Sequence, residues 1–463
     1  MNKLIRFGVD YVSYVVRGGP KFYAWLASLG VLIAIWAYCF SVQVIEGLAV
    51  TGLTSQVSDG LYLGNVIFLV GVAAAAVTVV FPAYAYHHKA LHEVTVLGEM
   101  VAIAAVTMCN VFVLSHMGRP DLIWHLFPII GIFNIPNSMI AFDVLALNVY
   151  LLLNLVGGFY FLYTKYTGSR INKSWYLPLI YVSIVWALSI HTVTAFFINT
   201  MPARPHWNHA IMPIQFITTA FAAGPGLIIL MFLVIRRNTK LWIADEAIDT
   251  LSTIITYCLG IALFLLMSEI VTELYLPSEH TLGLEYLMFG VHGLNTLVPW
   301  FWASLSALVV AFVMLLIPRV RKNYRLLPVA CVLAFAGIWV QKGVGLLVPG
   351  FIPSPIGEFT NYSPTAIEIF VTLGNWAIGF FILTILVKGA IGILTGEVKY
   401  ASAPWEVSRD VVPFYRPSFE PAKMQPWAPS SDPIARLEAG GDTRMGSRTR
   451  RQGRSEFAKR ARK

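Results

Sequence analysis

The sequence predicts an all-α integral membrane protein of ten transmembrane helices, arranged as two four-helix bundles (spans 2–5 and 6–9) flanked by spans 1 and 10. Of the 463 residues, 57% are hydrophobic and only 12% are charged. A soluble domain has about 25% charged residues, so half that fraction over this length indicates a polytopic membrane protein. In addition, ten separate apolar stretches reach the roughly 20 residues that are needed to cross a bilayer.

The elements follow in order along the chain. Residues 1–21 contain four basic residues but no cleavage site after a short apolar core, so we expect an uncleaved cytoplasmic lead-in. The ten-helix membrane domain is expected over residues 22–400. Its spans are predicted at approximately 22–48, 61–85, 94–116, 139–164, 175–199, 210–235, 247–274, 289–317, 326–348 and 364–394. Residues 401–463 are rich in Pro, Ser, Gly and Arg, which predicts a basic cytoplasmic tail that is extended or disordered.

The distribution of Lys and Arg predicts the orientation. These residues gather in the loops after the even-numbered spans: Lys89; Lys165, Arg170 and Lys173; Arg236, Arg237 and Lys240; and Arg319, Arg321, Lys322 and Arg325. The loops on the other side hold only Arg119 and Arg204. Because cytoplasmic loops are enriched in Lys and Arg, both termini are predicted to be cytoplasmic. The net charge of +9 therefore reflects membrane topology, and we expect no nucleic-acid partner.

The four cysteines are isolated inside apolar runs, and no CxxC or CxxCH motif occurs. Iron–sulfur clusters are held by cysteine thiolates, and c-type haem is attached through a CxxCH motif. We therefore expect no metal, no iron–sulfur cluster and no covalently attached haem in this chain. The cysteines are interpreted as small packing residues.

The intramembrane polar residues are predicted to lie in the outer half of the bilayer. Spans that run outward have them late in the span, and spans that run inward have them early. They are His116, His191, Glu269, Glu273, Gln341 and Lys342 in the first group, and Asp143, Gln215, His292, Asn295 and Glu368 in the second. An ionisable group inside a membrane costs about 2.5–3.5 kcal/mol on insertion scales, so it usually faces a cavity, a partner or a ligand. His191, Glu269, Glu273, His292, Lys342 and Glu368 are thus candidates for a proton relay.

The stretch Val111–Leu145 is the predicted centre of the site. His116 ends one span and Asp143 lies in the first turns of the next, so both are expected at the same depth. Elsewhere, Glu99 and Lys388 lie near cytoplasmic span ends, where snorkelling explains them. Arg119, Asp121, Arg204 and Glu279 are interpreted as interfacial anchors.

Two pairs in the second half share a helix face by spacing: Glu269 with Glu273, and His292 with Asn295. Lys342 lies inside span 9 and needs a carboxylate partner, for which Glu273 and Glu368 are candidates. The positions of polar groups in spans 2–5 and 6–9 correspond, which suggests a parallel repeat.

An outer-half cavity with His, Asp, Glu and Lys among aromatic residues suits a lipid-soluble molecule that exchanges protons, and quinone is the obvious candidate. An alternative is a proton-coupled secondary transporter, because Gly224-Pro225-Gly226 in span 6 resembles the helix breaks of transporters. A b-type haem subunit is a third possibility, with an axial pair drawn from His116, His191 and His292.

Four stretches carry a resemblance to a known family: HMGRPD at 116–121, IPNSMIAFD at 135–143, GLLVPGFIPSPIGEFTNYSPTAIEI at 345–369, and the LGNWAIGFFILTILVKGAIGI run that follows. The chain resembles the NrfD/PsrC family of quinone-reactive membrane subunits over about residues 20–397. Within this family it is most similar to the ten-span branch of the DsrP-like and HmcC-like complexes.

The resemblance implies a quinone-reactive subunit that is not catalytic alone, in the cytoplasmic membrane of a bacterium or archaeon. It would exchange electrons between menaquinone or ubiquinone and a periplasmic ferredoxin-like iron–sulfur subunit, with a multihaem cytochrome and other subunits in the complex. The chain itself would hold no haem or cluster. The family's catalytic and quinone-binding positions correspond best to His116 and Asp143, with Arg119 and Asn137 in support. We expect the headgroup between His116 and Asp143, with Asp143 also able to pair with the imidazole, and Arg119 beside the carboxylate.

Overall fold

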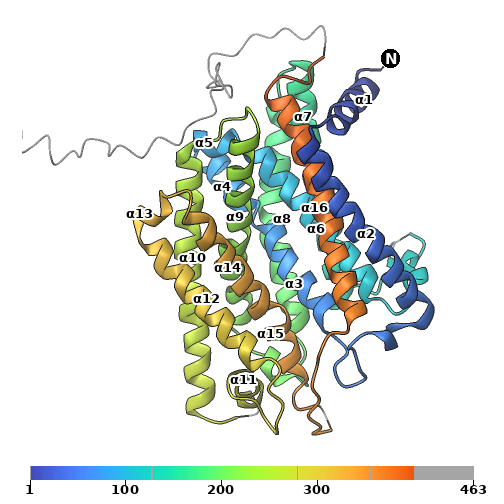
Figure 1. Cartoon of the computed structure of the whole chain (residues 1–463), viewed down its shortest axis with the longest axis vertical. Helices are drawn as coiled ribbons and strands as arrows, with labels where there is room; N and C mark the ends of the chain where they lie inside the picture. Colours follow the sequence, from blue (N-terminus) through green and yellow to red (C-terminus); the bar gives the residue numbers. More distant parts are fainter. Residues whose placement is uncertain (1, 127–128, 279, 355, 401–463) are drawn as a thin grey trace, which may run out of the picture. The chain divides into compact units, whose positions relative to one another are not determined.

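The computed structural model describes residues 2–126, 129–278, 280–354 and 356–400. The predictions for Glu279 and for the tail lie outside these residues. Within them, the regular elements are helices (Figure 1), and Val291 and Leu294 form an isolated bridge. Ten helices in this part of the chain are long and apolar enough to cross a membrane. The predicted all-α class is confirmed, and the chain is a multi-pass membrane protein.

The spanning helices agree with the predicted spans to within about three residues at most ends. They are α2 (Pro20–Glu46), α3 with α4 (Leu61–Ala74, Val77–Ala85), α6 (Thr95–His116), α7 (Met139–Thr167), α8 (Lys173–Asn199), α9 (Met212–Asn238), α10 (Asp245–Tyr275), α12 (Val298–Leu316), α14 with α15 and η4 (Leu327–Lys342, Val344–Leu347, Val348–Phe351) and α16 (Ala366–Leu394). The lead-in contains a further helix, α1 (Lys3–Val16). Span 8 differs most, because α12 begins at Val298 and the preceding segment forms a separate short helix, α11 (Thr281–Met288).

The helix contacts form two closed rings of four. In the first ring, α3 packs on α6, α6 on α7, α7 on α8, and α8 on α3. In the second, α9 packs on α10, α10 on α12, α12 on α14, and α14 on α9. The rings meet where α3 and α8 contact α9, while α2 and α16 lie side by side against the first ring (Figure 1). The predicted pair of four-helix bundles thus has both flanking spans on one bundle.

Span 2 is the most enclosed of the ten spans. In its apolar 18-residue stretch 89% is buried, against 17% in the corresponding stretch of α2. Close packing of α9 on this span requires glycine, because a Cβ on Gly224 would lie 2.0 Å from the Ala75 Cβ. The predicted helix break at Gly224-Pro225-Gly226 is wrong, since α9 continues through it. The helix break that favoured a transporter is therefore absent from α9.

The explanation given for Glu99 is also wrong. Its side chain does not reach the membrane surface: the residue is 3% exposed, and its Oε2 atom is buried without a hydrogen-bond partner among the described residues. Lys388, the other cytoplasmic-end residue, binds the end of α1. Its Nζ donates to the carbonyl oxygens of Val15, at 2.8 Å, and Arg17, where the C-terminus of a helix favours a cation.

Candidate functional site

His116 ends α6 and pairs with Asp59, in the segment before α3. His116 Nε2 lies 2.9 Å from Asp59 Oδ1, and the two side chains are 25% and 24% exposed. Asp59 Oδ2 accepts a hydrogen bond from Ser58 Oγ at 2.8 Å. Because a carboxylate only accepts hydrogen bonds, it favours the neutral imidazole tautomer with the proton on Nε2. The Nδ1 atom, which is buried and has no partner among the described residues, is then a free acceptor.

The segment that carries Asp59 is held by the outer end of α16. The backbone N–H of Leu61 donates to Tyr362 Oη at 2.7 Å, and the Tyr362 hydroxyl donates to Glu368 Oε1. The other carboxylate oxygen of Glu368 accepts from the Gly52 N–H at 2.9 Å. Glu368 was predicted as a relay candidate. Its two oxygens instead anchor the backbone on both sides of Asp59.

Arg204, interpreted from the sequence as an interfacial anchor, lies near this pair. Burial alone would raise the pKa of Asp59, but the hydrogen bond from His116, the charge of this ring when it is protonated, and smaller effects of Ser58 and Arg204 lower it below its ordinary value. The guanidinium of Arg204 stacks over Phe351, with its carbon 4.4 Å from the ring centre. Asp59 is therefore an ionised partner for His116 at neutral pH.

Asp143 lies five residues after Ser138, the residue that caps α7. Its Oδ1 accepts a hydrogen bond from Thr194 Oγ1 of α8 at 2.5 Å. In the described part of the chain, no hydrogen bond or ion pair joins Asp143 to His116, although α6 and α7 pack together. The predicted direct pairing of the carboxylate with the imidazole is not observed, and each group has its own partner.

Among the described residues, no hydrogen bond or ion pair joins Arg119 or Asn137 to Asp143. The Arg119 side chain is 71% exposed and makes a bidentate contact with Asp121, at 2.9 and 2.7 Å. Asn137 is exposed, and its side chain contacts Asn134 Oδ1 at 3.4 Å. The expectation that Arg119 lies beside the Asp143 carboxylate is wrong, because the adjacent Asp121 holds the guanidinium.

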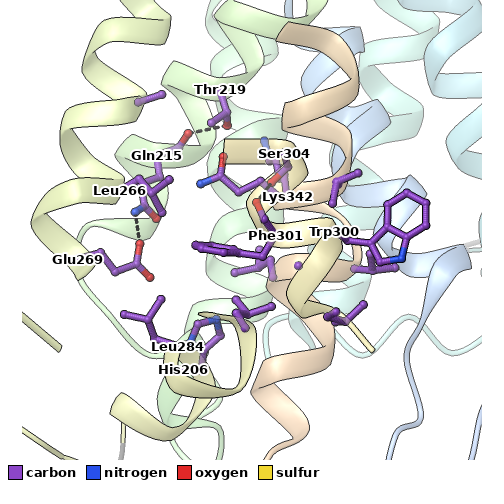
Figure 2. A pocket seen from close by; sticks show the side chains of 18 of the residues that line it. His206, Gln215, Thr219, Leu266, Glu269, Leu284, Trp300, Phe301, Ser304 and Lys342 are labelled. Atoms are coloured by element: carbon purple, nitrogen blue, oxygen red, sulfur yellow. Dashed lines mark hydrogen bonds between the residues drawn. The ribbon is translucent and has the colours of Figure 1, made fainter. Parts of the chain in front are cut away.

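The second ring lines a partly open pocket (Figure 2). Its walls come from α9, α10, α11, α12 and α14, and most of its lining is apolar. The polar residues that line it are His206, Gln215, Thr219, Glu269, Ser304, Gln341 and Lys342, of which Glu269 and Lys342 carry acidic and basic groups. A largely apolar cavity with a few convergent polar groups is typical of a small-molecule site.

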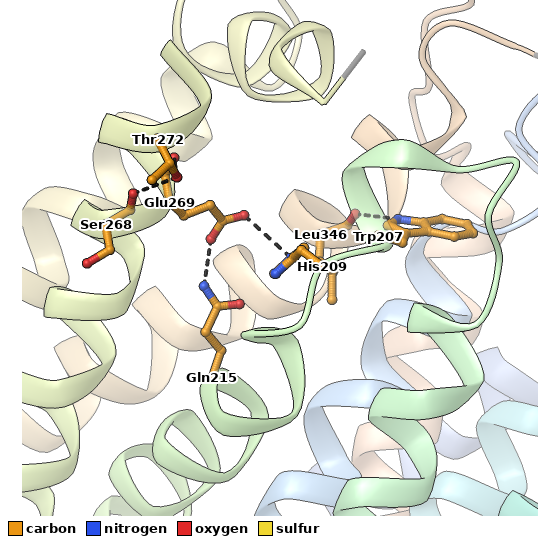
Figure 3. Close-up of polar contacts among 7 residues, drawn as sticks. All are labelled: Trp207, His209, Gln215, Ser268, Glu269, Thr272 and Leu346. Carbon is orange, nitrogen blue, oxygen red and sulfur yellow. Dashed lines mark hydrogen bonds and ion pairs between the residues drawn. The ribbon is translucent and has the colours of Figure 1, made fainter. Parts of the chain in front are cut away.

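Glu269 is held by Gln215 of α9 and lies near His209 of the α8–α9 segment (Figure 3). Gln215 Nε2 donates to Glu269 Oε2 at 2.6 Å, and His209 Nε2 lies 3.7 Å from Oε1. Burial, assisted by the charge of His280, lowers the pKa of His209 to about 4, so its ring is neutral at pH 7 and forms no ion pair. Glu273 lies one turn further along α10, as predicted, and does not line the pocket.

Lys342 has a different partner from the one predicted. Its Nζ lies 2.6 Å from His191 Nε2 and 3.2 Å from the carbonyl oxygen of Phe216, and no carboxylate among the described residues pairs with it. His191 comes from α8, Phe216 from α9 and Lys342 from α14, so this contact lies where the two rings meet. Glu273 and Glu368 are therefore wrong as partners of Lys342.

His292 and Asn295 are not in a membrane span. Both are exposed in the segment between α11 and α12, where Gly290 and Gly293 also have positive φ. His292 has φ 51° and its ring centre lies 4.5 Å from that of Phe359. The predicted shared helix face is wrong. Of the three histidines suggested for a haem pair, His292 thus lies outside the spans, and the other two are bonded to Asp59 and Lys342.

Sequence reasoning missed Asp59 and Thr194. Asp59 is the only acidic residue between spans 1 and 2, and it immediately precedes the outer start of span 2. The argument from position at the outer end of a span, which selected His116, applies equally to Asp59. Asp59 could therefore have been predicted from the sequence. Thr194 gives no comparable signal, because hydroxyl groups are common in membrane helices and usually bond their own backbone.

Comparison with known proteins agrees with the resemblance noted from the sequence. The sequence profile described as "Polysulphide reductase, NrfD" matches residues 49–352. The chain is 24% identical over 391 residues to a putative dimethyl sulfoxide reductase membrane subunit of Halobacterium salinarum, covering 78% of this chain and 89% of the relative. It is 22% identical over 398 residues to a selenate reductase subunit of Mesobacillus selenatarsenatis, covering 75% and 89%. The chain belongs to the NrfD polysulphide reductase family.

The matched residues include both Asp59–His116 and the pocket of the second ring, whereas α16 lies beyond them. The assignment to the DsrP-like and HmcC-like branch stays a prediction.

Proposed function

We propose that this chain is the quinone-reactive membrane subunit of a reductase complex. It exchanges electrons between the membrane pool of menaquinone or ubiquinone and an iron–sulfur subunit on the periplasmic side. The names of the two relatives, each of which describes one subunit of a reductase, support a place in such a complex. The alternation of Lys and Arg between loops supports cytoplasmic termini in the inner membrane.

The observation that carries this proposal is the Asp59–His116 pair with its free Nδ1. A quinol releases two electrons and two protons when it is oxidised. His116 Nδ1 is a buried atom without a hydrogen-bond partner among the described residues, at the outer end of α6, and in this proposal it accepts a proton from the quinol headgroup. The Asp59 carboxylate, 2.9 Å from Nε2, stabilises the imidazolium that forms when Nδ1 takes a proton.

Asp143 is the second proton acceptor. It lies on the helix next to α6 and accepts a single side-chain hydrogen bond, from Thr194. A carboxylate has about four lone-pair sites, so most of its acceptor capacity is open to the quinol. The two protons go to His116 and Asp143, and the two electrons pass to the partner subunit. In the reverse direction the same groups return the protons to a quinone.

The outer loop between α6 and α7 is suited to dock that partner. Ile129, Ile130 and Ile132 are 98%, 68% and 91% exposed, and Trp124 is 42% exposed. A group of exposed apolar side chains in one loop is typical of a surface that binds a partner protein. From the sequence, the outer segments 200–210 and 349–363 are further candidates for docking, but Trp207 and Phe351 in these segments are buried in the core.

The partner surface can be tested by photo-crosslinking. Benzoyl-phenylalanine at Ile132 is expected to capture an iron–sulfur subunit of the native complex. The same probe at Tyr86, which is 74% exposed in a loop on the predicted cytoplasmic side, serves as the control. Capture of the iron–sulfur subunit from position 86 alone would contradict the proposed side.

The proposed function itself is tested with the purified complex. Adding a short-tailed quinol is expected to reduce the redox centres of the partner subunits. This reduction is measured by optical or electron paramagnetic resonance spectroscopy. The control is the same complex with this subunit stripped away, in which quinol should leave the centres oxidised. Equal reduction with and without the subunit would refute the proposal.

A further inference from the structure

The pocket of the second ring is separate from the Asp59–His116 pair. It lies among α9, α10, α11, α12 and α14, and Asp59, His116 and Asp143 are not among its lining residues. Its polar groups come from different walls: Glu269 from α10 and Lys342 from α14 (Figure 2). Lys342 is 5% exposed, and the Glu269 side chain is 13% exposed.

The polar groups define what the pocket can accept. A ligand carboxylate would face Glu269, and a ligand cation would face Lys342, so a charged ligand is disfavoured by one end or the other. A neutral molecule that accepts a hydrogen bond from Lys342 and donates one to Glu269 satisfies both. A lipid tail makes neither bond, and Glu269 and Lys342 then keep only their protein partners, Gln215 for Glu269 and His191 with the Phe216 carbonyl for Lys342.

Between these ends, the walls are apolar and partly aromatic. They include Leu266, Leu284, Leu287, Leu297 and Phe301. The pocket also reaches the outside of the helix ring, because Trp300, which lines it, is 56% exposed on the spanning helix α12.

We propose that this pocket is a second binding site for a neutral quinone or quinol, distinct from the site at His116. Lys342 donates to one ring oxygen, and Glu269, held by Gln215, accepts from the hydroxyl of a quinol. The two sites adjoin through α8: His191, which contacts Lys342, and Thr194, which binds Asp143, are three residues apart on that helix. In naming the quinol class, this inference rests on the proposed function. It requires binding only.

The test counts bound quinol analogue on the purified complex. The probe is a fluorescent hydroxyquinoline N-oxide with a heptyl tail, whose emission is quenched on binding. The wild type is expected to bind two equivalents per chain. Ala262→Phe, which fills the pocket from α10, is expected to bind one. The matched control is Ile261→Phe, at a neighbouring position that is 47% exposed, and it should keep two.

If the Ala262→Phe variant fails to accumulate, the second site is tested with Glu269→Gln instead. Because this variant loses the charged acceptor, the Kd of the second bound equivalent is expected to rise about tenfold or more. Glu273→Gln, outside the pocket, should leave this Kd unchanged. A single equivalent that is lost in His116→Ala and kept in Ala262→Phe overturns the second site but leaves the proposed function intact. A single equivalent that is lost only in Ala262→Phe supports the pocket and overturns the placement at His116. No binding in the wild type overturns both.

Discussion

Replacing His116 with alanine will slow quinol-dependent turnover of the assembled complex by about 10²- to 10⁴-fold, the usual cost of losing a positioned proton acceptor. Asp59→Asn is expected to fall in the same range for a different reason. The asparagine amide can donate a hydrogen bond to His116 Nε2, so the ring proton moves to Nδ1 and the acceptor disappears. The measurement is turnover with a short-tailed quinol, normalised to the amount of complex.

The control for these variants is Asp121→Asn. Asp121 is also an outer-side carboxylate paired with a cation, but it is 56% exposed and pairs with Arg119 in the loop. Water and salt screen an exposed pair so that it contributes little to stability, and this variant should assemble and turn over like the wild type. Normal turnover in His116→Ala and Asp59→Asn would place the reacting quinol elsewhere. A loss of assembled complex that accounts for the whole loss of turnover would make the pair structural.

The number and ends of the spans could be predicted because they depend on local properties. A run of about 20 apolar residues has few alternatives to a membrane helix. The main error concerns residues 289–297. That stretch reads as apolar enough to begin span 8, but Gly290, His292 and Gly293 adopt positive φ, which ends α11 and delays α12 to Val298. Hydropathy does not report backbone conformation.

The partners within the site depend on contacts distant in sequence. Depth along the spans identified His116 and Asp143, but it could not determine which groups touch. Leu61 and Tyr362 are bonded across 301 residues, and this bond helps to hold Asp59 opposite His116. Lys342 similarly meets His191 across 151 residues rather than a carboxylate at its own depth. Helix rotation and the order of helices in the rings decide such pairs, and neither follows from hydropathy.

Replacing Asp143 with asparagine should have an effect of the same size as the loss of His116, about 10²- to 10⁴-fold in quinol-dependent turnover. Asparagine keeps the shape of the side chain and can still accept from Thr194, but it cannot take a proton. Thr194→Val should have a smaller effect, since it removes one donor and leaves the carboxylate in place. Thr192→Val is its control, because Thr192 lies on the same helix, is half-buried and bonds only the Leu188 carbonyl among the described residues.

The combination of His116→Ala with Asp143→Asn tests whether the two groups serve one quinol. Groups that act as a unit are strongly non-additive, because the first loss already abolishes the step that the second group assists. The double variant is therefore expected to turn over no more slowly than the slower single variant, within about threefold. The quantity to compare is kcat/KM, again normalised to complex abundance. If the two effects multiply instead, His116 and Asp143 act in separate steps. Wild-type turnover of Asp143→Asn would leave His116 and Asp59 as the only proton acceptor pair supported at the outer end of the first ring.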